Sequence, residues 1–349
     1  MRGADESATW AEIMRQPVIW RRWAGPLAGR AADLRDWIAS HDEIWLSGAG
    51  TSAYVGEIAA WGERRLVPAP TTDVVACPQD WLGREGRILS VQFGRSGDSS
   101  ESVGMLDLLD AHRPDISRLS ITCNGEGALA ARMTGADARA IVLPEATHDA
   151  GFAMTSSFTT MLLTALACLG AIEVRVLRDL ADRAETILSD LEARVIPRPD
   201  RAVFLGSGAL RGAARESALK VLELTAGRTA TGWDSALGFR HGPKSFVGED
   251  TCVFVSVHPH PHTARYDRAI AAEVAAQFPG ASLVTMGEGC EIEIGTCGEP
   301  RADAVLHVLA AQVLAARWSA ELGLDVDDPF EGRALTRVVS GVALHPFAA

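Results

Sequence analysis

The stretch Glu43-Ile-Trp-Leu-Ser-Gly-Ala-Gly-Thr-Ser52 decides how the fold of this chain is interpreted. An apolar run of strand length, residues 44–46, leads into a serine–glycine turn, and a helix-forming segment follows. Glycines let a backbone approach an anion closely, and a helix start offers unpaired N–H groups at the positive end of its dipole. The backbone of Gly50 and the hydroxyls of Thr51 and Ser52 could therefore bind a phosphate. The alternative is an ordinary tight turn. The stretch is not a Walker loop, and it lacks the third glycine of a dinucleotide fingerprint.

A second stretch of the same form follows the next apolar run. It reads Gly94-Arg-Ser-Gly-Asp-Ser-Ser-Glu101 and precedes a helical pattern. Because loops at the carboxyl ends of neighbouring parallel strands converge at a switch point, we expect both Gly/Ser loops to surround one anion. The hydroxyls would come from Ser96, Ser99 and Ser100, and Arg95 could add a charge-assisted fork. The alternative is two polar turns whose serines only cap helices.

The composition excludes several classes of partner. The 349 residues carry a formal net charge of −12, which argues against binding to a nucleic-acid backbone or an anionic membrane. Six scattered cysteines without a CxxC motif, and an N-terminus without a signal peptide, predict a protein of the reducing cytoplasm. The most apolar stretch, residues 158–172, is too short and too rich in threonine to span a bilayer.

Apolar runs and helical patterns alternate along the first half of the chain, as is typical of βαβ units in a parallel sheet. Strands are expected at residues 44–46, 88–93, 119–123 and 140–143, and helices at 8–39 (interrupted at Pro17), 103–109, 155–169 and 176–193.

The pattern starts again after a polar stretch, Pro197-Arg-Pro-Asp200, which we interpret as a linker. Val203-Phe-Leu-Gly-Ser-Gly208 again runs from an apolar strand into glycines, and an apolar run at residues 252–257 follows at a similar spacing. The economical interpretation is an α/β protein with two doubly wound, flavodoxin-like parallel sheets in tandem. The second copy has no Thr-Ser after its glycines, so we assign the phosphate to the first. The expected domains are a helical segment at 1–40, the two copies at 41–196 and 201–323, and a tail at 324–349.

A cluster of charges opens the second copy. Glu216, Lys220 and Glu223 fall at i, i+4 and i+7, which places them on one face of a helix. A solvated salt bridge is the usual explanation of such spacing. The loop that follows, Thr231-Gly-Trp-Asp-Ser-Ala-Leu-Gly-Phe-Arg-His241-Gly-Pro-Lys244, favours chemistry, because it holds a histidine between cations and in front of Gly-Pro. A carboxylate and a histidine near a sugar phosphate suit a proton-shuttling isomerase.

The alternating histidines of His258-Pro-His-Pro-His262 could also bind a metal, but histidines spaced by prolines in a loop more often do not, and we expect no metal.

These motifs resemble the SIS (sugar isomerase) family. The matching stretches are Ser-Gly-Ala-Gly-Thr-Ser, Arg-Ser-Gly-Asp-Ser, Glu-Ser-Ala-Leu-Lys-Val-Leu-Glu and Arg-His-Gly-Pro. Within that family the chain is similar to the galactosamine-6-phosphate deaminases, a group also called tagatose-6-phosphate ketose–aldose isomerases. The similarity to this group rests on three stretches: Gly151-Phe-Ala-Met-Thr-Ser-Ser-Phe158, Phe239-Arg-His-Gly-Pro-Lys-Ser245, and the tail Arg337-Val-Val-Ser-Gly-Val342 with His345-Pro346.

The resemblance implies a role for each candidate residue. By similarity to the isomerase half of glucosamine-6-phosphate synthase, the phosphate would be held by Ser52, Ser96 and Ser99, with Arg95 in place of a glutamine and Gly94 in place of a serine. Glu223 would move the proton between C1 and C2 beside Lys220, and His241, supplied by a second subunit, would open the sugar ring. Arg337, in a tail that closes the active site, replaces a lysine; an arginine stays protonated, so its role would be electrostatic.

The implied reaction converts galactosamine 6-phosphate to tagatose 6-phosphate and ammonia in a cytoplasmic homodimer or larger homo-oligomer with shared active sites. No metal or organic cofactor is expected, because the C1 carbonyl itself makes the C2 proton acidic. The alternatives are an aldose–ketose isomerase without ammonia release, a glucosamine-6-phosphate deaminase, and a non-catalytic sugar-phosphate sensor. A sensor usually carries an N-terminal helix-turn-helix domain, for which about 40 residues before the first strand leave little room.

Overall fold

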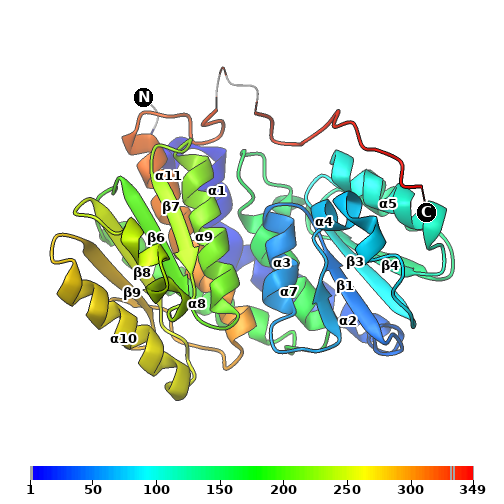
Figure 1. Cartoon of the computed structure of the whole chain (residues 1–349), viewed down its shortest axis with the longest axis horizontal. Helices are drawn as coiled ribbons and strands as arrows, with labels where there is room; N and C mark the ends of the chain where they lie inside the picture. Colours follow the sequence, from blue (N-terminus) through cyan, green and yellow to red (C-terminus); the bar gives the residue numbers. More distant parts are fainter. Residues whose placement is uncertain (1–2, 331, 333–334, 349) are drawn as a thin grey trace. The chain divides into compact units, whose positions relative to one another are not determined.

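The computed structural model describes residues 3–330, 332 and 335–348. It divides into two compact units, each with one five-stranded parallel sheet (Figure 1). We call them the β1 unit (Arg22–Asp149, Ser156–Val174 and Thr336–Ala349) and the β6 unit (Met1–Arg21, Ala150–Thr155 and Arg175–Leu335). Neither unit is continuous in sequence, whereas the predicted domain ranges are, and the ranges 41–196 and 201–323 each contain one complete sheet.

The sheet of the β1 unit has the strand order β2-β1-β3-β4-β5. Its strands are β1 (Glu43–Ser47), β2 (Leu66–Pro68), β3 (Ile88–Gly94), β4 (Ser117–Thr122) and β5 (Ala138–Val142). Its helical elements are most of α2 (Gln16–Ala39), α3 (Thr51–Ala59), α4 (Thr71–Ala76), η2 (Pro78–Asp80), α5 (Ser100–His112), α6 (Ala128–Ala131), η3 (Glu145–Thr147) and α7 (Ser156–Cys168). The winding reverses between β1 and β3, which makes that pair the switch point. Ser47 lies opposite Gln92 in the register, so the loops after both strands begin side by side at the carboxyl ends of the strands.

The sheet of the β6 unit has the order β10-β9-β8-β6-β7, which is the same winding read from the other side. Its strands are β6 (Arg201–Gly206), β7 (Ala230–Asp234), β8 (Thr251–Ser256), β9 (Ser282–Gly287) and β10 (Ile292–Glu293). Its helical elements are η1 (Ala4–Glu6), α1 (Ala8–Met14), α8 (Val176–Ala193), α9 (Leu210–Leu224), η4 (Gly238–Arg240), η5 (Pro243–Phe246), α10 (Pro261–Gln277) and α11 (Pro300–Glu321). Its switch point lies between β6 and β8. Figure 1 shows α9 and α10 on opposite faces of this sheet, which is therefore doubly wound.

The predicted fold class is confirmed, and so is the repetition of one fold along the chain. The predicted strands and helices lie within a few residues of their observed bounds, and the break near Pro17 is the junction between α1 and α2. The strands β2, β7, β9 and β10 were not predicted; β2 and β10 are only three and two residues long, and β7 contains a glycine. Residues 231–234 belong to β7, whereas the sequence predicts them to be part of the loop before His241. Within the described residues, no helix combines the length and the apolar character that crossing a bilayer requires.

Candidate active site

The first Gly/Ser loop of the β1 unit is a tight turn that only glycine can make. A Cβ at Gly48 would lie 2.5 Å from the backbone carbon of Ser52, and Gly50 has a φ of 55°. Gly50 is also the N-cap of α3 and gives that helix no side-chain cap. The side chains of Thr51 and Ser52 are buried in the first turn of α3. The predicted strand–turn–helix unit is thus present, and its hydroxyls lie at the switch point.

The second loop, between β3 and α5, is held by its own hydrogen bonds. Ser99 caps α5: its hydroxyl accepts from the N–H of Ser102 at 3.3 Å and donates to the Ser102 hydroxyl at 2.7 Å. The Ser96 hydroxyl accepts from the N–H of Asp98 at 3.3 Å. The Asp98 carboxylate in turn accepts from the N–H of Ala128 at 2.8 Å, which ties the loop to α6. The capping role that we considered as an alternative is therefore real for Ser99, and it leaves a rigid loop at the switch point.

The C-terminal tail lies along this second loop. The buried guanidinium of Arg95 donates to the backbone oxygen of Arg337 at 3.0 Å, and Arg337 donates to the backbone oxygen of Asp149. Further along, the N–H of Ser100 donates to the Val339 oxygen at 3.2 Å. The structure thus brings Arg95, Ser100 and Arg337 together within the β1 unit. Two guanidiniums at one switch point give this part of an acidic protein a local positive charge.

Asp149 is a structural residue that sequence reasoning missed. Its carboxylate is fully buried and accepts from the Ser156 hydroxyl at 2.5 Å, and from the N–H and the hydroxyl of Ser157 at 2.9 and 2.6 Å. It therefore fixes the start of α7 and the segment that precedes it. An N-cap is usually recognised directly before its helix, whereas Asp149 acts from several residues away, so no local pattern announces it.

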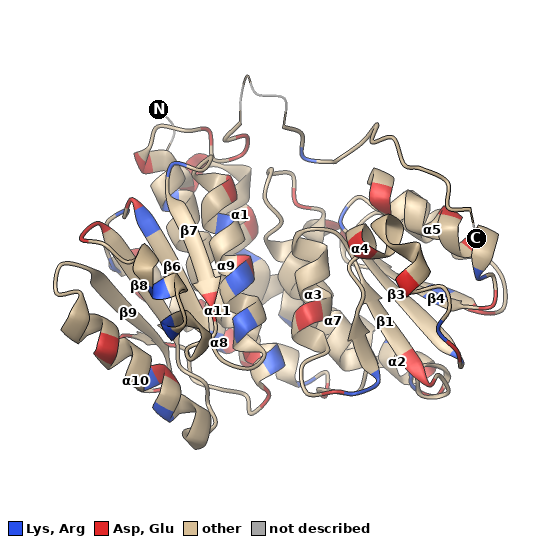
Figure 2. Ribbon diagram, viewed as in Figure 1, with Lys and Arg blue, Asp and Glu red and all other residues tan. Residues whose placement is uncertain are grey.

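The charge cluster of the β6 unit lies on α9, where basic and acidic positions stand close together (Figure 2). The Lys220 ammonium is 2.6 Å from a Glu223 oxygen and 3.4 Å from a Glu216 oxygen. Glu216 and Lys220 are fully buried, and the Glu223 side chain is 23% exposed. The alternative of a solvated salt bridge is therefore wrong.

The pKa of Lys220 reflects the balance of forces in this cluster. Burial by itself lowers the pKa of Lys220, but the carboxylates of Glu216 and Glu223 outweigh burial and raise the pKa above its usual value. Lys220 therefore stays a cation, with its ammonium against the Glu223 carboxylate. Of the three side chains only that of Glu223 is partly exposed, so it is the member of the cluster that a ligand can meet.

His241 is presented on an anchored loop. Phe239 is buried in the core of the β6 unit, and the carboxylate of Glu273 on α10 binds both cations that flank the histidine: Arg240 at 2.6 Å, and Lys244. The imidazole of His241 itself is exposed. The next residue, Gly242, has a φ of 124°, which a side chain would disfavour. The loop therefore holds the backbone of His241 in place and leaves its ring at the surface.

The switch point of the β6 unit repeats the first one in backbone but not in side chains. Gly206 and Gly208 stand where the β1 unit has Gly48 and Gly50; a Cβ at Gly206 would run into the backbone of Leu210, and Gly208 has a φ of 63°. Buried Ala209 and Leu210 replace the two hydroxyl residues. The second switch point therefore lacks the two hydroxyls that we predict as phosphate ligands in the first.

A carboxylate of the chain itself lies at this second switch point. Buried Asp267 accepts from the Ser207 hydroxyl at 2.5 Å and from the N–H of His258 at 2.9 Å. The histidines after β8 serve the backbone: the ring nitrogens of His258 and His260 accept from the N–H groups of His260 and His262. Among the described residues, no group of three or more His, Cys, Asp or Glu side chains is arranged to hold a metal ion.

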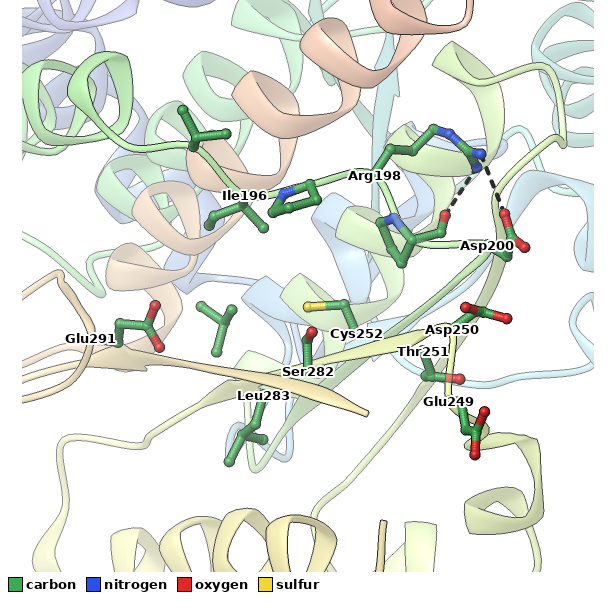
Figure 3. Close-up of a pocket in the computed structure, with 14 residues that line it drawn as sticks. Ile196, Arg198, Asp200, Glu249, Asp250, Thr251, Cys252, Ser282, Leu283 and Glu291 are labelled. Carbon is green, nitrogen blue, oxygen red and sulfur yellow. Dashed lines mark hydrogen bonds and ion pairs between the residues drawn. The ribbon is translucent and has the colours of Figure 1, made fainter. Parts of the chain in front are cut away.

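Figure 3 shows a cavity of about 520 Å³ at the other end of the β6-unit strands. It lies at the amino ends of β6, β8 and β9, and its walls include the predicted linker around Arg198. Arg198 is already engaged, since it donates to the Pro199 oxygen at 3.1 Å and pairs with Asp200 at 3.3 Å. Ligands of open α/β sheets bind at the carboxyl ends of the strands, so we do not assign this cavity to the active site.

Comparison with known proteins decides the family. D-galactosamine-6-phosphate deaminase AgaS of Escherichia coli is 39% identical over an alignment of 376 positions, which covers 99% of this chain and 98% of the relative. The chain belongs to the AgaS family. A second AgaS deaminase, from Shewanella sp. (strain ANA-3), is 36% identical over 97% of this chain and 92% of its own length. No protein-family model matches the chain.

The fold of this AgaS-family chain is also that of a solved relative. The crystal structure of tagatose-6-phosphate ketose/aldose isomerase from Escherichia coli superposes with a TM-score of 0.88 at 36% identity, covering 100% of this chain and 99% of the other. The expected resemblance to SIS-type phosphosugar isomerases is confirmed. The family thus carries two names, one for a deaminase and one for an isomerase.

Proposed function

We propose that this AgaS-family chain is a galactosamine-6-phosphate deaminase, which converts galactosamine 6-phosphate and water to tagatose 6-phosphate and ammonia. The observation that carries the proposal is the buried cluster on α9, in which Lys220 lies between two carboxylates and, of the three, only Glu223 is partly exposed. Burying such charges is costly, and the presence of the cluster therefore favours a functional role. The names of the AgaS relatives supply the substrate.

In this proposal the β1 unit holds the phosphate. Gly50, Thr51 and Ser52 of the first loop, together with Ser96, Ser99 and Ser100 of the second loop, supply N–H groups and hydroxyls at the switch point. Arg95 supplies a charge-assisted contact, and Arg337 of the tail adds positive charge. The net charge of −12 makes these local cations necessary, because the protein as a whole repels an anionic substrate.

The β6 unit carries the proton transfers. His241 gives a proton to the ring oxygen and accepts one from the C1 hydroxyl, which opens the pyranose to the aldehyde. Glu223 then takes the C2 proton and returns it at C1 through an enolamine, so that a ketimine stands at C2. Water adds to that imine, ammonia leaves, and the ketose phosphate remains. Lys220 acts by holding the Glu223 carboxylate in position through their ion pair at 2.6 Å.

The closest competing reaction is aldose–ketose isomerisation without loss of ammonia. The same proton transfer would serve it, and the solved relative bears an isomerase name. A glucosamine-6-phosphate deaminase is a further alternative, since C4 stereochemistry is read by loop residues that carry no recognisable motif.

Two further parts of the proposal concern assembly and location. We propose a homodimer, or a larger homo-oligomer, in which His241 serves the substrate bound by the partner; the exposed ring on an anchored loop supports this. We also propose a cytoplasmic location, supported by six cysteines that are all unpaired.

A panel of substrates tests the proposed function. The purified chain is mixed with galactosamine 6-phosphate, glucosamine 6-phosphate and galactose 6-phosphate, and both ammonia and ketose phosphate are measured. The proposal expects ammonia and tagatose 6-phosphate in equal amounts from the first compound, with a lower kcat/KM for the second. Conversion of galactose 6-phosphate at a higher kcat/KM than galactosamine 6-phosphate would make the chain an isomerase instead.

A further inference from the structure

His148 is an exposed histidine to which sequence analysis gives no role. It directly follows η3, and η3 follows β5, so it lies at the edge where the strands of the β1-unit sheet end. The loops after β1 and β3 leave the sheet at this same edge. Among the described residues, the imidazole of His148 has no hydrogen-bonding partner, although its backbone N–H donates to Glu145 at 2.9 Å.

The charged groups around this imidazole are two guanidiniums and one carboxylate. Arg337 of the tail donates to the backbone oxygen of Asp149, the neighbouring residue, and Arg95 of the β3–α5 loop donates to the backbone oxygen of Arg337. The Asp149 carboxylate is buried and already accepts three hydrogen bonds at the start of α7. The surroundings of His148 are therefore positive in the absence of a ligand.

Burial and the guanidiniums of Arg337 and Arg95 lower the pKa of His148, and the Asp149 carboxylate opposes them only in part. A phosphate dianion bound among the same guanidiniums would instead raise the pKa of His148, because a negative charge within a few ångströms favours the protonated imidazole. The site would then hold a group that is neutral when empty and cationic when filled.

We infer that His148 is a third cationic ligand of the substrate phosphate, beside Arg95 and Arg337, and that it takes up its proton as the phosphate binds. The inference rests on the phosphate site of the proposed function. It adds to the two Gly/Ser loops a residue from a third loop, the one that follows β5 at the carboxyl ends of the same strands. It also makes substrate affinity depend on pH through a group of the enzyme that performs no step of the reaction.

The direction of that dependence follows from linkage. Because the filled site binds the proton more tightly than the empty site, affinity is highest below the pKa of the empty site. It falls as the pH rises through the higher pKa of the filled site, and then stays constant. The pH-dependent part of the affinity is the part that His148 supplies.

The test uses galactitol 6-phosphate, which carries the phosphate but has neither the carbonyl nor the amine that the reaction needs. Calorimetric titrations at pH 7.5 in two buffers with different ionisation enthalpies give the number of protons taken up on binding. Titrations from pH 6.5 to pH 9 give the affinity. The variants are His148→Gln, which keeps a neutral donor, and His148→Lys, which keeps a permanent charge. His262→Gln, at an exposed histidine of the β6 unit, is the matched control.

We expect the wild type and the control to take up a fraction of a proton, and His148→Gln to take up none. His148→Gln should bind about tenfold more weakly than the wild type at pH 6.5 and equally well at pH 9. His148→Lys should bind at pH 9 about as tightly as the wild type does at pH 6.5.

Two results would overturn the inference, and they differ in what else they affect. Binding to the wild type without proton uptake, or a His148→Gln affinity equal to the wild type across the pH range, removes His148 from the phosphate site and leaves the proposed function intact. Failure of the wild type to bind galactitol 6-phosphate at all would remove the phosphate site itself, and the proposed function with it.

Discussion

The two switch points of this chain share one backbone conformation but differ in the side chains that surround it. Both follow a strand with a Gly-x-Gly turn whose second glycine has a positive φ, 55° in the β1 unit and 63° in the β6 unit. In the β1 unit that turn leads to Thr51 and Ser52, with arginines nearby. In the β6 unit it leads to Ala209 and Leu210, and the carboxylate of Asp267 takes the available donors. The doubly wound topology therefore provides a place for an anion twice. In the β6 unit that anion is the carboxylate of Asp267, and in the β1 unit we propose that it is the substrate phosphate.

This difference assigns separate tasks to the two units. In the proposed function, the β1 unit binds the substrate phosphate at its switch point, and the β6 unit, whose switch point is closed, supplies α9 and the loop after β7 for proton transfer. The following predictions test that assignment, beginning with the largest expected effect.

Glu223→Gln should lower kcat by roughly 10²–10⁴-fold, because the amide keeps the shape of the side chain and loses its basicity. Exchange of solvent deuterium into C1 of the product should disappear with it. Glu288→Gln, at an exposed carboxylate of the same unit, is the control and should leave kcat unchanged. Turnover of Glu223→Gln near the wild-type rate would show that the base lies elsewhere.

Mixing two inactive variants, His241→Asn and Glu223→Gln, should restore activity if subunits share their sites. A mixed dimer then has one intact site of two, and random exchange predicts about a quarter of the wild-type rate. The measurement is ammonia release after subunit exchange, which native mass spectrometry verifies. Inactive mixed dimers would place His241 in the site of its own chain.

Ser96→Ala should raise KM by about 10- to 150-fold, which corresponds to the loss of a charge-assisted hydrogen bond. The matched control is Ser207→Ala at the closed switch point, whose hydroxyl donates to Asp267. Ser207→Ala should cost about 1 kcal/mol of the free energy of unfolding and leave KM unchanged. A larger KM effect at Ser207 than at Ser96 would reverse the assignment of the two switch points.

Asp267→Asn should change the pH dependence of stability by a small amount. Burial raises the pKa of Asp267 in the folded protein, although hydrogen bonds from Ser207 and His258 oppose the rise. The folded state therefore binds the proton more tightly than the unfolded state. The contribution of this carboxyl to the free energy of unfolding falls as the pH rises from its unfolded pKa to its folded pKa. Chemical unfolding of both proteins from pH 4 to pH 7 should show the wild type losing stability relative to the variant. A constant difference across that range would contradict the shifted pKa.

Much of the fold could be predicted because its signals are local. The Gly-x-Gly turns, the buried run of β3 and the i, i+4, i+7 charges on α9 are all contained in short stretches. What could not be predicted depends on residues far apart in sequence. Asp149 caps a helix from a distance, and Asp267 occupies the second switch point from α10. The burial of Lys220 distinguishes a functional cluster from a surface salt bridge, and burial is a property of the packed unit.

The roles of the site residues remain predictions that the family alone does not test. The sequence favours the first Gly/Ser loop over the second copy because of Thr51 and Ser52, and the structure adds a physical reason in the apolar Ala209 and Leu210. His148 shows the opposite case. Nothing in its sequence neighbourhood marks it. Its two arginine neighbours come from elsewhere in the β1 unit, Arg95 from the β3–α5 loop and Arg337 from the tail.

The separation of tasks is tested most directly by measuring binding and turnover in the same two variants. Ser52→Ala and Glu223→Gln are each titrated with galactitol 6-phosphate and assayed for ammonia release from galactosamine 6-phosphate. We predict that Ser52→Ala binds at least about tenfold more weakly than the wild type, whereas Glu223→Gln binds as the wild type does and yet releases almost no ammonia. Equal loss of binding in both variants, or unchanged binding in Ser52→Ala, would contradict the account.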